Sequence, residues 1–225
     1  MTHFRGAESF FCDLGIHVEQ YLYYTNLGEA KQRGRELAKM GAIVPCPRRR
    51  YFARLPFSAS KIEFPDPRPI VGVHLAGSKF SMSVQGQMGL VTKSLPVGVL
   101  QGLQALQQFN IIVFGTKAEL AALGLRETTD VRFACFDRIS ESLSAAAQCS
   151  ALVGSDSAMK TMTSMLRIPT IVWMGDYPDF FRDCVFIGPY VEAGVMEVFR
   201  YTDLSLDLGA GIQFTQAALA DFGIG

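Results

Sequence analysis

The sequence predicts an α/β protein in which a parallel sheet is covered by helices on both faces. From residue 70 onward, short apolar runs alternate with helical patterns. The runs are nearly continuous, as in parallel strands that are buried on both faces. One stretch, residues 151–175, contains a strand, a polar turn, a helix and a second strand within 25 residues, which is a compact βαβ unit. These observations indicate a Rossmann-like domain over residues 70–225.

The predicted elements follow one another closely along this domain. Strands are expected at 70–75, 111–114, 131–136, 151–153, 170–174 and near 185–187, and helices at 96–108, 117–123, 140–149, 158–166 and 215–222. Pro96 marks the start of a helix, and Pro169 stops one. The interval from 77 to 93 is longer than a compact turn, and we expect it to be mobile until a ligand binds.

Residues 1–69 differ from this domain in their sequence pattern. Short amphipathic helical patterns give way to a stretch with prolines at 45, 47, 56, 65, 67 and 69, which exclude long regular elements. We interpret residues 1–69 as an abbreviated helical and proline-rich arm. Arg48, Arg49 and Arg50 could grip a phosphate or an anionic acceptor, although three basic residues in such a loop are more often a solvated turn.

Composition excludes several classes of function. The 21 basic and 21 acidic side chains balance, which argues against nucleic-acid binding. Five scattered cysteines without a CxxC pair predict reduced thiols in a cytoplasmic protein, with neither a disulfide framework nor a zinc site. No spacing of His, Cys or carboxylates predicts a metal or another cofactor. No apolar run approaches 18 residues, so we expect no membrane span.

The polar turn after residue 153 is the main candidate site. Ser155, Asp156 and Ser157 stand between a strand and a helix, at the edge where open α/β sheets bind ligands. All three can cap the helix, and the amides behind them favour an anion. Lys160 stands one turn later, where a cation opposes the helix dipole and is better explained by a nearby phosphate. The alternative is that Asp156 and Ser157 are only helix caps.

The string that begins at this turn resembles the nucleotide-sugar loop of glycosyltransferase family 9, the heptosyltransferase-like enzymes of GT-B architecture. Residues 156–171 read DSAMKTMTSMLRIPTI, in which the Asp-Ser helix start and the Pro-Thr strand match the family pattern. The family commonly has Gly in place of Ala158 and His in place of Thr161. The resemblance implies that Asp156 and Ser157 contact the donor's sugar and diphosphate, and we expect Ala158, Lys160 and Thr161 to belong to the same donor site.

Two further stretches carry the same resemblance. Residues 93–96, KSLP, are similar to the family's K-x-W-P element, in which the Lys meets the donor phosphate; Leu95 replaces the aromatic residue. Without the resemblance, Lys93 reads as a surface lysine. Residues 115–119, GTKAE, are similar to its G-x-x-x-E element, which implies that Glu119 accepts hydrogen bonds from the donor ribose; we expect Thr116 to belong to the same donor site. Glu119 could equally be a first-turn glutamate that complements the helix dipole.

Other strand ends hold weaker candidates. Gly77 and Ser78 form a small-residue turn whose backbone could approach a phosphate closely. Residues 136–138 fall near the position where the family holds the base through main-chain groups. We expect His74, inside a strand, to be a satisfied core histidine, and Trp173 to be a buried indole. The absence of G-x-S-x-G and of G-x-G-x-x-G argues against a serine hydrolase and a dinucleotide oxidoreductase.

The resemblance covers the carboxy-terminal, donor-binding half of a GT-B enzyme, about residues 70–190. In this family an inverting, metal-independent transfer uses a base from the amino-terminal domain, and 69 residues are too few for a second domain of ordinary size. A shortened segment could supply the base, with Asp13, His17 or Glu19 as weak candidates. Alternatively a partner chain or second copy completes the cleft, the chain is a fragment of a longer enzyme, or it is a non-catalytic nucleotide- or sugar-binding or assembly module.

Overall fold

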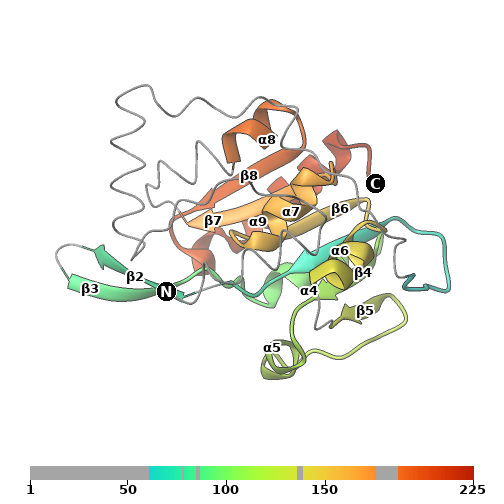
Figure 1. The fold of residues 1–225 in the computed structure, drawn as a ribbon, viewed down its shortest axis with the longest axis horizontal. Coiled ribbons are helices and arrows are strands. Elements are labelled where there is room, and N and C mark those ends of the chain that lie inside the picture. The colour runs from blue at the N-terminus through green and yellow to red at the C-terminus, as the bar shows by residue number, and fades with distance from the viewer. Residues whose placement is uncertain (1–60, 78, 85–86, 136–138, 176–186) are drawn as a thin grey trace, which may run out of the picture.

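The computed structural model describes residues 61–225, except residues 78, 85–86, 136–138 and 176–186 (Figure 1). Several predictions therefore lie outside the described residues. They concern Arg48, Arg49 and Arg50, the candidate bases Asp13, His17 and Glu19, Ser78, the expected amphipathic helices of the arm, and residues 136–138.

Six parallel strands form the central sheet, in the order β5-β4-β1-β6-β7-β8. These strands are β1 (Ile70–His74), β4 (Asn110–Phe114), β5 (Val131–Ala134), β6 (Ala151–Ser155), β7 (Thr170–Gly175) and β8 (Met196–Tyr201). Counted along the chain, the six strands lie in the order 3-2-1-4-5-6, which is the arrangement of a doubly wound Rossmann sheet. The predicted fold class is confirmed.

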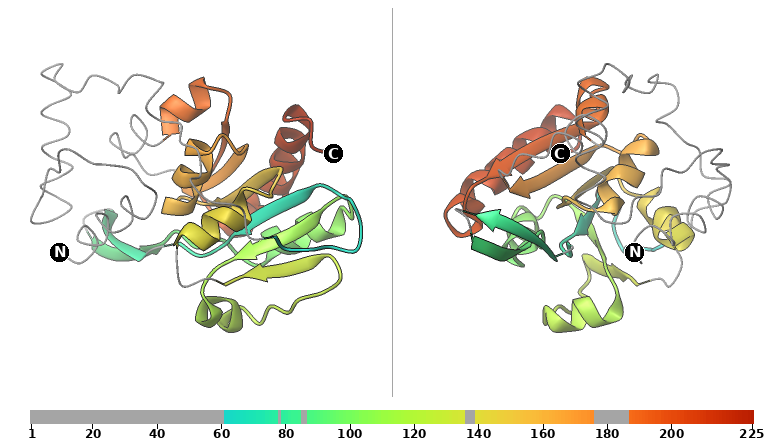
Figure 2. Two further views of the ribbon diagram at one scale, coloured as in Figure 1. Left: turned by 45° about the vertical axis from the view of Figure 1, so that its right-hand side comes forward. Right: turned by 60° about the vertical axis from the view of Figure 1, so that its left-hand side comes forward.

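Helices cover both faces of this sheet (Figures 1 and 2). One face packs against α4 (Gly98–Ala105), α5 (Lys117–Ala122) and α9 (Leu204–Asp221), and the other against α6 (Ile139–Ala146), α7 (Ala158–Met165) and α8 (Gly188–Glu192). Alternate residues of each strand serve the two faces: Val71 and Val113 pack with α4, whereas Ile112 and Leu152 pack with α6 and α7. Two apolar layers thus fix the sheet from both sides.

The longest helix, α9, packs against α4 and the sheet through small residues. Gly98 and Gly102, one turn apart on α4, face Leu208 and Ile212 of α9. At Gly211 the helix lies against the Trp173 ring, which is fully buried and donates a 2.9 Å hydrogen bond from Nε1 to Thr215 Oγ1. The expectation of a buried indole at residue 173 is confirmed.

Gly211→Ala is expected to lower the free energy of unfolding by about 1–3 kcal/mol, the usual range for overpacking a core. A Cβ at this position would lie 2.2 Å from Cη2 of Trp173, and the hydrogen bond to Thr215 restrains the ring from moving away. Gly209→Ala is the matched control on the same helix, because its Cβ would meet nothing within 4 Å. Urea denaturation should show the control to be as stable as the wild type or up to about 1 kcal/mol more stable. Equal stabilities for the two variants would contradict this packing.

The sixth strand lies further along the chain than predicted. The strand expected near 185–187 falls mostly on Val185 and Phe186, which lie outside the described residues, and Ile187 is buried directly before α8. The sixth strand of the described sheet is β8. Sequence reasoning missed β8 because it is an edge strand with exposed Glu197 and Arg200, and it lacks the continuous apolar run of its neighbours.

Two further elements differ from their predicted form. The interval 77–93, expected to be mobile, contains an antiparallel hairpin of β2 (Lys79–Val84) and β3 (Gln87–Thr92). It projects from the sheet in Figure 1 and in the left view of Figure 2. The carboxy-terminal helix begins at Leu204 and not at residue 215, because Asp203 caps it by accepting a 2.8 Å hydrogen bond from the Ser205 amide. Its first half was not predicted because Gly209 and Gly211 are unfavourable in a helix interior.

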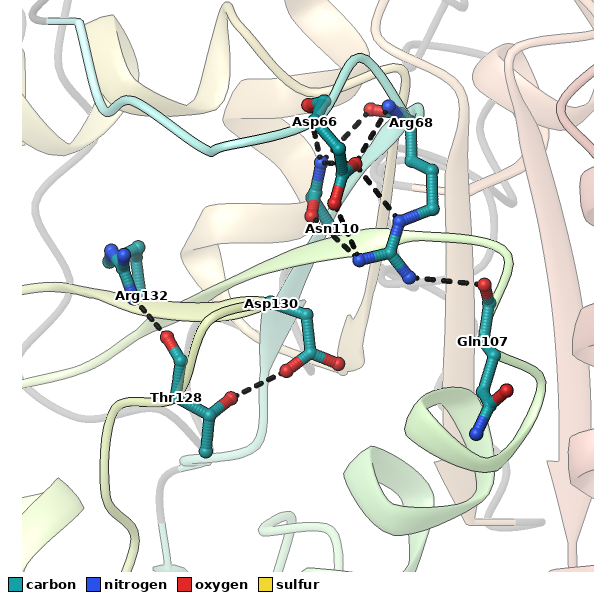
Figure 3. A network of polar contacts seen from close by, with 7 residues as sticks. All are labelled: Asp66, Arg68, Gln107, Asn110, Thr128, Asp130 and Arg132. Carbon is teal, nitrogen blue, oxygen red and sulfur yellow. Dashed lines mark hydrogen bonds and ion pairs between the residues drawn. The ribbon is translucent and has the colours of Figure 1, made fainter.

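Residues 61–69 lie against the amino ends of the strands (Figure 3). The buried Asn110 amide donates a 2.9 Å hydrogen bond to Asp66, and the Arg68 guanidinium donates two hydrogen bonds to the same carboxylate, at 2.9 and 2.8 Å. Hydrogen bonds from Arg68 hold the pKa of Asp66 below its usual range. Ile62 and Phe64 pack on the face that carries α6 and α7. This network holds the last part of the proline-rich stretch on the sheet, at the end opposite to the candidate site.

Candidate functional site

The strand order reverses between β1 and β6, and this switch point positions the candidate site. His74, the last residue of β1, pairs with Gly154 of β6, and Ser155 ends β6 beside it. Ser155 Oγ donates a 2.9 Å hydrogen bond to the Ala76 carbonyl, which joins the two segments that leave these strands. Open α/β sheets bind ligands at the carboxyl ends of the strands that flank such a reversal.

The segment that carries Lys93 is fastened to the end of β1. The Leu95 amide donates a 2.8 Å hydrogen bond to the Leu75 carbonyl, and Ser94 Oγ accepts a 3.0 Å hydrogen bond from the Gly77 amide. Leu95, which stands where the family pattern has an aromatic residue, is buried in the core. These contacts fix where the hairpin returns to the sheet, and they thereby fix the position of the Lys93 backbone.

Gly77 has a structural role that explains why a small residue stands there. A Cβ on Gly77 would lie 2.5 Å from the carbonyl carbon of Lys93, so only glycine allows the two backbones to pass this closely. The expected close approach is therefore to Lys93, whereas a direct phosphate contact of Gly77 stays a prediction.

Lys93 and Asp156 meet at this edge, together with Lys160. Lys93 Nζ lies 2.7 Å from Asp156 Oδ2, and Lys160 Nζ lies 2.6 Å from Asp156 Oδ1. The side chains of Asp156 and Lys160 are 6% and 3% exposed, whereas that of Lys93 is 23% exposed. One carboxylate thus joins two ammonium groups, and Lys93 is the one that solvent reaches most.

The charge state of Asp156 follows from these contacts. Burial raises the pKa of the carboxyl, but the ammonium groups of Lys160 and Lys93 outweigh this effect and lower the pKa to about 2. Asp156 is therefore ionised throughout the physiological range. The anion that sequence reasoning assigned to Lys160 was a phosphate; in the structure the carboxylate of Asp156 lies against its ammonium group.

Ser157 is the N-cap residue of α7, but its side chain caps nothing. Its Oγ lies 3.1 Å from Nδ1 of His74 instead. Since Asp156 pairs with lysines and Ser157 contacts His74, the interpretation of these two residues as helix caps alone is wrong. His74 is largely buried, and burial lowers its pKa despite the charge of Glu119. The expectation of a satisfied core histidine is confirmed.

The remaining donor-site candidates lie on the first turns of two helices. Ala158 is exposed and Thr161 is half-buried on α7. At α5, which follows β4, Thr116 Oγ1 accepts a hydrogen bond from the Glu119 amide and Glu119 Oε2 accepts one of 2.7 Å from the Thr116 amide. Glu119 thus has the role of a first-turn glutamate that was the alternative to ribose binding. A contact of either residue with ribose stays a prediction.

Sequence reasoning missed Tyr201 at the end of β8. Burial, and then the negative charge of Asp156, raise the pKa of this phenol. No motif in the sequence marks it, because its position depends on which strand occupies the sheet edge next to β7.

The part of the chain that the structure describes shows neither a metal-binding cluster nor a membrane-spanning helix. Within it, no three His, Cys, Asp or Glu side chains are grouped so that they could hold a metal ion. None of its helices combines the length and the apolar character needed to span a bilayer.

Comparisons with known proteins give structural similarities only. No protein-family model matches the chain, and no curated protein is a significant match. A glycosyl transferase of family 9 from Veillonella parvula is 14% identical, with a TM-score of 0.47, over 93% of this chain and 54% of that chain. The Escherichia coli heptosyltransferase WaaC, solved with ADP, is 18% identical, with a TM-score of 0.48, over 69% and 46%.

The chain is similar in structure to heptosyltransferases. These are the proteins that the motif resemblance indicates, and the chain spans about half of their length. A third similar structure is the C-terminal CMP-Kdo binding domain of WaaA from Acinetobacter baumannii, 12% identical, with a TM-score of 0.36, over 69% of this chain and 86% of that domain. At these identities the likeness extends to the fold and not to the chemistry.

Proposed function

We propose that this protein binds a nucleotide-diphosphate sugar at the carboxyl edge of the sheet and transfers the sugar to an acceptor. The observation that carries the proposal is the meeting of Lys93 and Asp156 at the start of α7, where the strand order reverses. A partly exposed ammonium group beside a helix N-terminus suits the diphosphate of such a donor.

The proposed chemistry stabilises a departing nucleoside diphosphate. As the bond between the sugar and the β-phosphate breaks, negative charge develops on the phosphate oxygen, and Lys93 together with the dipole of α7 offsets it. Ala158 and Thr161 of α7 line the sugar and phosphate side of this site, and Thr116 and Glu119 hold the ribose. In this proposal Lys93 supplies the charge that a metal ion would otherwise provide, so the transfer needs no metal.

The proposal places the general base outside the described part of the sheet domain. A base must accept a proton near the working pH, and a carboxylate whose pKa is held at about 2 is far too weak. Asp156 is therefore not the base. The base comes from the arm, with Asp13, His17 and Glu19 as candidates, or from a partner chain or second copy that completes the cleft.

We place the protein in the cytoplasm, in keeping with its scattered cysteines.

Incubation of the full-length chain with a panel of nucleotide-diphosphate sugars is expected to release free nucleoside diphosphate for one base class, with water or an added acceptor as the second substrate. EDTA should leave the rate unchanged, since no metal takes part in the proposed reaction. Chromatography of the nucleotides measures both results. Tight binding of a donor without release, at every acceptor tried, would favour a non-catalytic module. Failure to bind any member of the panel would overturn the proposal.

A further inference from the structure

Lys160 reaches the site through Asp156. It lies four residues after Asp156, so its side chain extends back along the start of α7 and its Nζ contacts Oδ1 at 2.6 Å. Lys93 takes the other carboxylate oxygen, Oδ2. The two lysines therefore occupy different oxygens and do not compete for one.

Lys160 is too deeply buried to be suited to direct contact with a ligand. Its side chain is 3% exposed, compared with 23% for Lys93. A buried ammonium group is costly unless an opposite charge accompanies it, and Asp156 provides that charge. Through this contact, Lys160 can affect a bound ligand by changing the charge that Asp156 presents to Lys93.

We propose that Lys160 is a positioning residue that neutralises Asp156, so that the ammonium group of Lys93 keeps its charge for the diphosphate of the ligand. This inference rests on the function proposed above. Two ammonium groups face one carboxylate, and the three side chains together carry one positive charge. Without Lys160, Asp156 would cancel the charge of Lys93, and an incoming diphosphate would have to compete with a carboxylate for it.

Two further titratable groups of the described residues lie near this cluster, and neither adds a charge at neutral pH. Tyr201 approaches Asp156 from β8, and its raised pKa keeps the phenol protonated. His74 approaches Ser157 from β1, and its lowered pKa keeps the imidazole neutral. Among the described side chains, the balance between Lys93, Asp156 and Lys160 therefore sets the local charge.

The test is calorimetric binding of inorganic pyrophosphate, and of ADP, UDP, CDP and GDP, to the full-length chain. Lys160→Met is expected to weaken binding by roughly tenfold or more, because it removes the charge that offsets Asp156. Lys61→Met makes the same change in composition and net charge at an exposed side chain on the amino side of the sheet domain, and should bind as the wild type does. Asp156→Asn combined with Lys160→Met leaves Lys93 beside a neutral amide, and is expected to restore binding of pyrophosphate to within about threefold of the wild type.

Each outcome separates this inference from the proposed function. If Lys160→Met binds pyrophosphate as tightly as the wild type, the inference is wrong while the proposed function stands. If the double variant stays as weak as Lys160→Met, the effect is structural and the inference is again wrong. A wild-type chain that binds neither pyrophosphate nor any of the nucleotides overturns the proposed function and the inference with it.

Two further measurements do not depend on the affinity of Lys160→Met for pyrophosphate. Asp156→Asn alone should bind pyrophosphate more tightly than the wild type, because the opposing carboxylate is gone; weaker binding would overturn the inference. Carbon-13 titration of the Asp156 carboxyl should show a higher pKa in Lys160→Met than in the wild type, and an unchanged pKa would overturn it as well.

Discussion

Asp156→Ala is expected to lower the free energy of unfolding by about 3–5 kcal/mol, the usual result of removing one partner from a buried ion pair. The side chain of Lys160 is 3% exposed and its ammonium group lies 2.6 Å from Asp156. The variant removes this carboxylate while the ammonium stays buried. Urea denaturation followed by circular dichroism measures the loss. A variant within about 1 kcal/mol of the wild type would show that the pair is not buried as described.

The matched control combines Asp156→Ala with Lys160→Met. Methionine is close to lysine in length and carries no charge, so the double variant buries an apolar side chain where the single variant buries a lone charge. We expect the double variant to recover most of the lost stability. The difference between the double variant and the sum of the single variants then measures the coupling of the two side chains. Additive effects would contradict direct pairing.

Acid titration gives an independent check on the same pair. The folded-state pKa of Asp156 is lowered to about 2, below the ordinary value of about 3.9 expected for the unfolded chain. The contribution of this carboxylate to stability is thus fully present above pH 4 and is lost as the pH falls toward 2. The stability of Asp156→Ala should fall less steeply over this range than that of the wild type.

The inner strands could be predicted from sequence because they are apolar without interruption. β1, β4, β6 and β7 are buried on both faces, and hydrophobic runs of this kind have few alternatives. β8 could not be found in the same way. It is an edge strand in which Glu197 and Arg200 are exposed, so its pattern depends on which neighbour it pairs with.

Sequence likewise indicated some residues of the candidate site but not the contacts between them. A polar turn between a strand and a helix indicated residues 155–157, and the resemblance indicated Lys93, 63 residues away in the chain from Asp156. Sequence could not show that Lys160 pairs with Asp156, because burial and side-chain direction decide that contact. Nor could it show that Gly77 packs on the backbone of Lys93, since the intervening hairpin brings them together.

Lys93→Met is expected to weaken binding of a nucleoside diphosphate by about 10- to 100-fold, the usual value of a hydrogen bond to a charged group, with little change in stability. Asp156 keeps Lys160 as its partner in this variant, so no buried charge is abandoned. Calorimetry at two salt concentrations measures the affinity, and the variant should show the weaker dependence on salt.

The decisive comparison adds Asp156→Asn to each lysine variant. Asp156→Asn should restore pyrophosphate binding to Lys160→Met, because Lys93 then keeps its charge, but it should not restore binding to Lys93→Met, because the ammonium group that meets the ligand is absent. Lys93 and Lys160 are therefore distinguishable although both contact the same carboxylate. Equal restoration of the two variants would mean that only the net charge near α7 matters and that Lys93 makes no contact of its own.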